Sequence, residues 1–417
     1  MQGSDQKIGR RNVTWNMVGS IAYALFSVLL LMVVTRTVGE EQAGVFSIAF
    51  TTGQLALTLG QFNMHPFQAT DIRQEYSFKE YFTSRCLTCV AMLLFSAAYI
   101  LISGYRVEKA IIVFLLCVYK MFDGLSDVFE GQFQQQGRLY IAGKAMTFRA
   151  VCAGTLFTVA IFTTKNLIFS CVIMVLTAFF SFLLFEVAAV GNAFQIGISK
   201  SRRVWRLLWF CLPLCVSSFM SNYIVNSSKY SIDRLMTETH QAHYGMIFMP
   251  AFAINLCSGF IFKPLLTKMA ELWADKKHGP FLRIVLKLCL FVVLLTVFAL
   301  IVGWFLGIPV LSWFYATDLS EYQWPMMIIL LGGGISAINV VIYYALTVMR
   351  CQRTVFWGYL ITFLLSWLLP PLLVERVGLL GAAIAYATLI AVLDLTFLAF
   401  FMLAFRKSTQ DSDSQEL

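Results

Sequence analysis

Charged residues are scarce in this 417-residue sequence. Asp, Glu, Lys and Arg make up 13% of it, against roughly 25% in an ordinary soluble domain, while hydrophobic residues make up 59%. A soluble protein of this length could bury a large core with fewer apolar residues, so much of the outer surface is expected to meet hydrocarbon. The composition excludes a separate soluble domain and predicts a membrane protein.

Clusters of metal-binding residues are also lacking. The cysteines are scattered singly through apolar stretches, except Cys86 and Cys89 in RCLTCV, and no second pair lies nearby. All four histidines are expected in loops, and none completes a metal-ligand set by its spacing; they are His65, His240, His243 and His278. The sequence therefore predicts no metal site and no cofactor, and the cysteines are interpreted as small helix-packing residues.

Long apolar segments run from end to end of the chain. Each is about the 20 residues that a helix needs to cross a bilayer, and helices are expected because lipid offers backbone groups no other partner. Twelve segments are predicted: 12–35, 43–64, 84–104, 109–131, 140–161, 166–190, 207–232, 244–263, 281–307, 322–347, 354–373 and 378–405. The expected fold is an all-α polytopic membrane protein of about twelve transmembrane helices.

Lys and Arg gather on one side of these segments, which the positive-inside rule makes cytoplasmic. Both termini are then inside, and the loops that hold Glu41 and Leu319 are outside. This bias accounts for the net charge of +9, so the excess of basic over acidic residues is not interpreted as a sign of nucleic-acid binding. A cleavable signal peptide is not expected, because the first apolar stretch is long and lacks a small-residue cleavage site.

Two stretches about 200 residues apart resemble each other. RTVGEEQAGVFSIAF and RLMTETHQAHYGMIFMPAF both run from an Arg through an acidic turn, a Gln-Ala pair and a Gly to Ala-Phe. The pattern predicts duplicated six-helix lobes related by a pseudo-twofold axis along the membrane normal. The N-lobe would cover 1–191, a basic cytoplasmic linker 192–206, the C-lobe 207–405 and a cytoplasmic tail 406–417. Two such lobes favour an alternating-access transporter.

One apolar segment carries a stripe of charge. Lys120, Asp123, Asp127 and Glu130 fall within about 80° of arc on a helix, and a charge facing lipid would cost at least ~2.5 kcal/mol. In one interpretation Lys120 pairs with Asp123 or Asp127, and Glu130 marks the cytoplasmic end. In the other, Lys120 faces a cavity as a cation for an anionic substrate, and the carboxylates tune it or bind a coupling ion.

Further charged residues at membrane depth are candidates for the same roles. Arg149 either lines a cavity or extends to the cytoplasmic interface. Lys229 and Arg234 flank Asp233, where local pairing is the default. Asp394 has no charge near it in sequence and is a candidate ion site, and Glu186 is expected at the interface.

Several segments in order resemble the Wzx-type oligosaccharide flippases of the multidrug/oligosaccharidyl-lipid/polysaccharide exporter superfamily. They are TRTVGEEQAGVFSIA, DIRQEYSFKEYFTSR, FEGQFQQQGR, LPLCVSSFMSNYIVNSSKYSID and YGMIFMPAFAINLCSGFIFKPLLTKMAELW. The resemblance implies two six-helix bundles around a cavity, in the bacterial plasma membrane. It implies translocation of a polyprenyl-diphosphate-linked oligosaccharide without covalent chemistry, coupled to Na⁺ or H⁺, with polysaccharide polymerase machinery as a partner.

The resemblance also suggests substrate cations and ion sites. Lys120, Arg149, Lys229 and Arg234 would meet the diphosphate, and Asp123, Asp127 and Asp394 would serve ion coupling. A polytopic glycan-processing enzyme is disfavoured, because the expected external loops are about a dozen residues or fewer. A major facilitator would carry a Gly-rich loop after the second helix, and HPFQATDIRQEYSFKEYF has no Gly. A cation-coupled multidrug exporter of the same superfamily remains the alternative.

Overall fold

The computed structural model describes residues 2–71, 73–190 and 195–413, and every regular element in these ranges is a helix. Nine stretches of this described chain are long and apolar enough to cross a membrane. The prediction of an all-α polytopic membrane protein is confirmed. Each of the twelve predicted segments is helical, whereas the number of membrane crossings and the lobe symmetry stay predictions.

The helices form two compact units, residues 1–219 and 220–417. The boundary between these units lies inside α9, and the predicted linker 192–206, whose first residues lie outside the described ranges, stays a prediction. Unit 1 contains α1 (Gln2–Val38), α2 (Glu40–Gln61), α3 (His65–Thr70), α4 (Phe78–Ser103), α5 (Val107–Gln135), α6 (Leu139–Thr164), α7 (Leu167–Ser181), the π-helix η1 (Phe182–Val187), α8 (Ala188–Val190) and the start of α9 (Arg203–Leu235).

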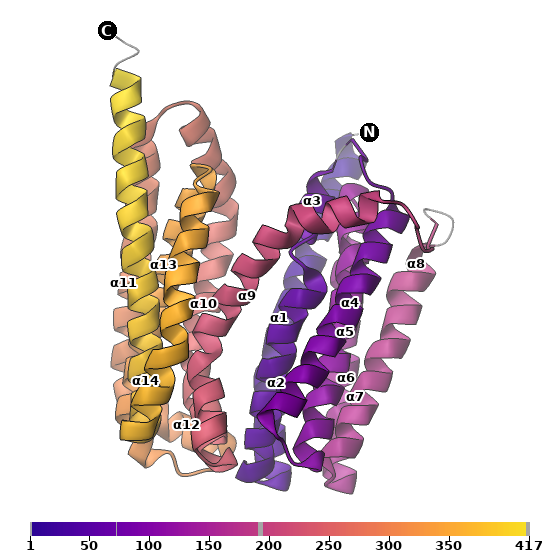
Figure 1. The fold of residues 1–417 in the computed structure, drawn as a ribbon, viewed down its shortest axis with the longest axis vertical. Coiled ribbons are helices and arrows are strands. Elements are labelled where there is room, and N and C mark those ends of the chain that lie inside the picture. Colours follow the sequence, from indigo (N-terminus) through magenta and orange to yellow (C-terminus); the bar gives the residue numbers. More distant parts are fainter. Residues whose placement is uncertain (1, 72, 191–194, 414–417) are drawn as a thin grey trace. The chain divides into compact units, whose positions relative to one another are not determined.

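In unit 1 the long helices lie alongside one another (Figure 1). α5 packs against α2, α4 and α7, and α1 packs against α6. Gly53 of α2 makes one close approach possible, since a Cβ there would lie 3.1 Å from Lys120 Cγ and 3.2 Å from the Leu116 carbonyl oxygen. The charged stripe of α5 is therefore enclosed by neighbouring helices.

Unit 2 is also built from helices in the part of the chain that the structure describes. Its elements are the end of α9, α10 (Glu238–Ala274), α11 (His278–Val302), the π-helix η2 (Gly303–Gly307), α12 (Ile308–Tyr315), the 3-10 helix η3 (Ser320–Tyr322), α13 (Gln323–Val348) and α14 (Gln352–Asp413). α13 packs against α10, α11 and α14. Each of the two stretches predicted to be duplicates spans a short junction between helices, α1 to α2 and α9 to α10.

α14 is a helical hairpin rather than one long rod. Its backbone leaves helical geometry at Gly378, where φ is 62° and ψ is −137°. Gly358 packs directly against Phe397, and Gly381 packs against the backbone of Leu373, so two antiparallel halves meet at a turn near residue 378. This agrees with separate predicted segments at 354–373 and 378–405.

The predicted loop position of the four histidines is wrong. His65 and His278 are the first residues of α3 and α11, and His240 and His243 lie in the first two turns of α10. The reason for three of them is that α10 and α11 extend beyond their apolar stretches, whereas His65 begins a separate short helix, α3. At α10, the Thr237 hydroxyl accepts the His240 backbone N–H and starts the helix before its apolar part.

Candidate functional site

The charged residues of α5 belong to a buried network in unit 1, hereafter the unit 1 network. It comprises Arg85, Lys120, Asp123, Asp127, Glu130, Arg149 and Glu186. Its members come from α4, α5, α6 and η1, and the predicted stripe is one side of it.

Lys120 contacts Asp123, as the structural interpretation of the stripe predicted. The Nζ atom lies 3.3 Å from Asp123 Oδ2 and also donates to the hydroxyl of Tyr23, which donates onward to the same carboxylate at 3.1 Å. The ammonium lies 4.4 Å from the centre of the Phe50 ring. Because Lys120 is fully buried, its charge is balanced inside unit 1.

Arg149 lies at the centre of the network. Its Nε donates to Asp123 Oδ1 at 3.1 Å, its Nη1 contacts Glu186, and its Nη2 lies 4.0 Å from Glu130. Glu186, which was expected at the membrane interface, is fully buried against Arg149, and its depth in the membrane stays a prediction. The pairing was missed because the two residues lie on different helices 37 positions apart.

Arg85 is a network member that the sequence interpretation missed. It is fully buried on α4 and donates to Asp127 Oδ2 at 2.5 Å and to the Gly60 carbonyl oxygen at 2.6 Å. The last carbonyls of a helix have no partner within it, and Arg85 satisfies one at the end of α2. The available signal was a charged residue near the start of the apolar segment 84–104.

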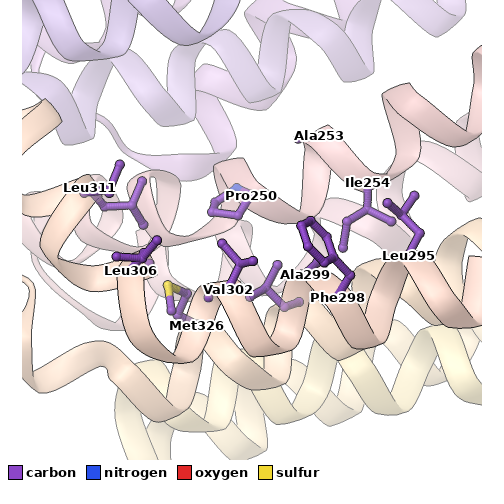
Figure 2. A pocket seen from close by; sticks show the side chains of 14 residues that line it. Pro250, Ala253, Ile254, Leu295, Phe298, Ala299, Val302, Leu306, Leu311 and Met326 are labelled. Atoms are coloured by element: carbon purple, nitrogen blue, oxygen red, sulfur yellow. The ribbon is translucent and has the colours of Figure 1, made fainter.

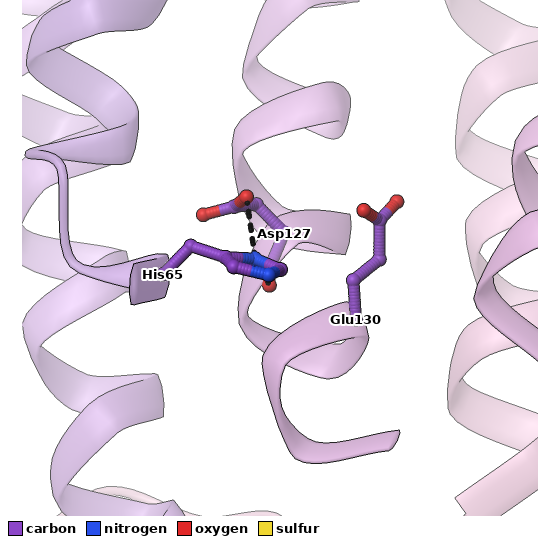
Figure 3. A group of neighbouring side chains, drawn as sticks. All are labelled: His65, Asp127 and Glu130. Carbon is purple, nitrogen blue, oxygen red and sulfur yellow. Dashed lines mark hydrogen bonds and ion pairs between the residues drawn. The ribbon is translucent and has the colours of Figure 1, made fainter. Parts of the chain in front are cut away.

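His65 completes the edge of the network. Its Nδ1 lies 3.0 Å from Asp127 Oδ1, and Glu130 comes from the next turn of α5 on the same side (Figure 3). One ring nitrogen of His65 and one carboxylate oxygen each of Asp127 and Glu130 lie within 4.8 Å of one another. The sequence predicted no such grouping, because His65 reaches Asp127 from the separate helix α3.

Lys229 is placed differently from Lys120 and Arg149. It is half-buried in unit 2, and its Nζ lies 4.6 Å from the centre of the Phe248 ring on α10. Within the described part of the chain no carboxylate lies within ion-pair distance of it. Lys229 lies against Phe248 and Arg234 is exposed in the last turn of α9, and the local pairing with Asp233 that was expected for both stays a prediction.

Asp394 is half-buried on the second half of α14. Asn339 of α13 faces this carboxylate, yet Asp394 Oδ1 and the Asn339 amide nitrogen each lack a hydrogen-bond partner among the residues described. An acceptor oxygen of this kind is compatible with the predicted ion site.

Unit 2 also contains an apolar cavity of about 390 Å³ (Figure 2). It lies among α10, α11, η2, α12 and α13, and its lining includes Pro250, Ile254, Phe298, Leu306 and Met326. No charged side chain lines it, so its chemistry suits hydrocarbon rather than sugar or phosphate.

Comparison with known proteins gives consistent matches. Residues 10–270 match the model of the family described as polysaccharide biosynthesis protein. The capsular polysaccharide biosynthesis protein CapF of Staphylococcus aureus is 21% identical over 389 residues, covering 90% of this chain and 94% of CapF.

The fold is shared with solved transporters. The lipid II flippase MurJ in an inward closed conformation has a TM-score of 0.69 at 13% identity, over 96% of this chain and 90% of MurJ. A mutant of the Vibrio cholerae MATE transporter VcmN has a TM-score of 0.64 at 13% identity, over 98% of both chains. The resemblance found in the sequence is confirmed, and the chain belongs to the polysaccharide biosynthesis protein family.

Proposed function

We propose that the protein moves a polyprenyl-diphosphate-linked oligosaccharide from the cytoplasmic to the outer leaflet of the bacterial plasma membrane. Family membership supports a role in polysaccharide biosynthesis, and the fold is that of multi-pass membrane transporters. Translocation needs no covalent chemistry, so the protein acts as a flippase and not as an enzyme. Both termini lie in the cytoplasm, and the exported glycan passes to polysaccharide polymerase machinery.

The observation that carries this proposal is the environment of Lys229. A cation taken from water into a low-dielectric site without a counter-charge is costly, and the Phe248 ring compensates only part of that cost. A diphosphate would supply the absent negative charge and strong acceptor oxygens. Lys229 is therefore proposed as the principal cation for the lipid diphosphate.

The other three cationic candidates have weaker support. Lys120 and Arg149 already face carboxylates within unit 1, so a diphosphate would have to compete with those partners. Arg234 is exposed at the end of α9, opposite the basic linker, so a headgroup that arrives from the cytoplasm would reach Lys229 first. Lys120 and Arg149 are assigned to holding unit 1 together.

A complementation experiment tests this function. In a strain lacking the gene, the lipid-linked glycan is expected to accumulate on the inner leaflet and surface glycan to disappear. Lys229→Ala should fail to restore surface glycan although the protein reaches the membrane, and Lys229→Arg should restore part of it because the charge persists. Lys277→Ala is the matched control in unit 2, since Lys277 is exposed beside Asp275.

The multidrug exporter is the competing function, because a MATE transporter shares the fold equally well. Intact surface glycan in the deletion strain, together with increased sensitivity to cationic drugs, would establish the exporter instead. Wild-type glycan export by Lys229→Ala, with the wild-type gene restoring export, would remove Lys229 from the diphosphate site.

A further inference from the structure

The two ring nitrogens of His65 both face hydrogen-bond acceptors. Nδ1 lies 3.0 Å from the Asp127 carboxylate and 3.2 Å from the Asp127 carbonyl oxygen, and Nε2 lies 3.0 Å from Gln134 Oε1. A neutral imidazole has one N–H and can donate from only one nitrogen, whereas an imidazolium donates from both. The geometry is that of a histidine that has bound a proton.

The charge balance of the unit 1 network leads to the same protonation state. The network holds four carboxylates, Asp123, Asp127, Glu130 and Glu186, against three permanent cations, Arg85, Lys120 and Arg149. Buried charges are stable when they are paired. A protonated His65 supplies the fourth positive charge, while a neutral His65 would require one of the four carboxyl groups to hold the proton instead.

One further buried oxygen near His65 lacks a donor. Gln68 Oε1, one turn along α3 from His65, has no hydrogen-bond partner among the described residues. The Gln68 side chain is fully buried. The region around Asp127 and Glu130 is therefore rich in acceptors and short of a positive charge.

A proton suits this site better than a divalent metal ion. Asp127 Oδ2 is already occupied by Arg85 at 2.5 Å, and Arg149 lies 4.0 Å from Glu130, so a divalent cation would meet two guanidinium groups. The three permanent cations of the unit 1 network leave a deficit of one positive charge against its four carboxylates, whereas a divalent ion would add two. The His65 side chain is 27% exposed, which gives a proton a route from water.

We propose that His65, together with Asp127 and Glu130, is a proton-binding site that couples proton movement to transport. The proton adds to one ring nitrogen of His65, and no other bond forms or breaks. The groups that face it are Asp127, Glu130 and Gln134 of α5; Arg85 of α4 acts through Asp127, and Arg149 of α6 and Glu186 of η1 act through Glu130. The coupling, but not the proton binding itself, rests on the proposed function.

Nitrogen NMR can test the protonation state directly, because the chain has only four histidines. The full-length protein is labelled with ¹⁵N-histidine in lipid nanodiscs, and the His65 signal is identified by its loss in His65→Gln. The expected signal near neutral pH is that of an imidazolium. Glu130→Gln should lower the pH at which the ring loses its proton by about one unit, a tenfold loss of proton affinity.

Glu75→Gln is the matched control, since Glu75 is an exposed carboxylate of the same unit, and it should leave the His65 signal unchanged. A neutral His65 ring near pH 7 in the wild-type protein would overturn the proposal. So would a change of the His65 signal when Na⁺ replaces K⁺ at fixed pH, because that result would assign the site to a metal ion.

A transport measurement then tests the coupling. His65→Gln, which cannot bind the proton, and His65→Lys, which keeps a permanent charge, should both reduce surface glycan at least tenfold while the protein remains in the membrane. His240→Gln serves as the histidine control, since that ring contacts Thr237. Wild-type export by His65→Gln would overturn the coupling. Intact surface glycan in the deletion strain would refute the proposed function and leave the NMR result intact.

Discussion

Arg85 of α4 and Asp127 of α5 form a hydrogen-bonded ion pair at 2.5 Å in which the arginine is fully buried. The same arginine donates to the end of α2 through the Gly60 carbonyl oxygen, and Thr88 donates to that oxygen at 2.7 Å. One side chain thus joins three helices of unit 1. Because α3 also contacts Asp127 through His65, the position of the proposed proton site depends on this pair.

Arg85→Met is expected to destabilise the protein by about 3–5 kcal/mol, because it leaves the Asp127 carboxylate without its guanidinium partner. Adding Asp127→Asn should recover part of that loss by removing the uncompensated charge. The measurement is the midpoint of thermal unfolding in detergent. Arg73→Met is the control, since Arg73 is exposed and should be near neutral. Equal stability of Arg85→Met and Arg73→Met would contradict the buried pairing.

Lys120 is expected to act on stability rather than on substrate. Lys120→Ala should lower the unfolding midpoint by an amount that corresponds to about 3 kcal/mol, because Asp123 loses one of its partners in a buried site. Asp123→Asn in the same chain should restore both stability and glycan export. Lys277→Ala breaks an exposed pair and should cost about 1 kcal/mol or less. Normal stability with abolished export would instead place Lys120 in the substrate path.

Gly378→Ala should destabilise the protein by about 1–3 kcal/mol, because the backbone there combines a φ of 62° with a ψ of −137°, a conformation that a Cβ strains. The readout is again thermal unfolding of the purified protein. Gly279 in the first turn of α11 has open space around it and no positive φ, so Gly279→Ala should change the midpoint little. Identical midpoints for the two variants would contradict the hairpin turn.

Thiol labelling tests the predicted topology. In a Cys-depleted background, cysteine at Glu41 or Ser320 should react in whole cells with an impermeant reagent, since both positions are exposed and the charge bias puts them outside. Leu319→Cys, which the sequence also places outside, should stay unreactive because Leu319 is fully buried. Cysteine at Ala274 should react only after the membrane is permeabilised. Labelling of Ala274 in intact cells would reverse the orientation.

Contacts along one helix could be predicted from the sequence. Lys120 and Asp123 are three residues apart, a spacing that places them on one face of any helix, and the structure joins them. The partners of Asp127 could not be predicted in this way. Arg85 and His65 reach it from α4 and α3, and such contacts depend on how closely helices pack, as at Gly53 where α2 meets α5.

The ends of the helices were less predictable than their centres. Apolar composition marks the part of a helix that lies in hydrocarbon, whereas α10 runs from Glu238 to Ala274 around a predicted segment of 244–263. His240, His243 and His278 were misplaced for this reason, whereas His65 lies in the separate short helix α3. The contact of Glu186 with Arg149 was hard to predict for a second reason: Glu186 lies in the π-helix η1, where the side-chain direction departs from the regular 3.6-residue period.

The turn at Gly378 has a consequence for how the protein is made. The two halves of α14 are joined almost without a loop, with Glu375 and Arg376 exposed beside the turn. Because this link is too short to span the bilayer, the first half cannot insert into the membrane while the second half remains in water. We expect both halves to leave the translocon together. A premature stop codon soon after Gly378 would then remove two membrane crossings rather than one, because the first half would lose the partner that covers Gly358.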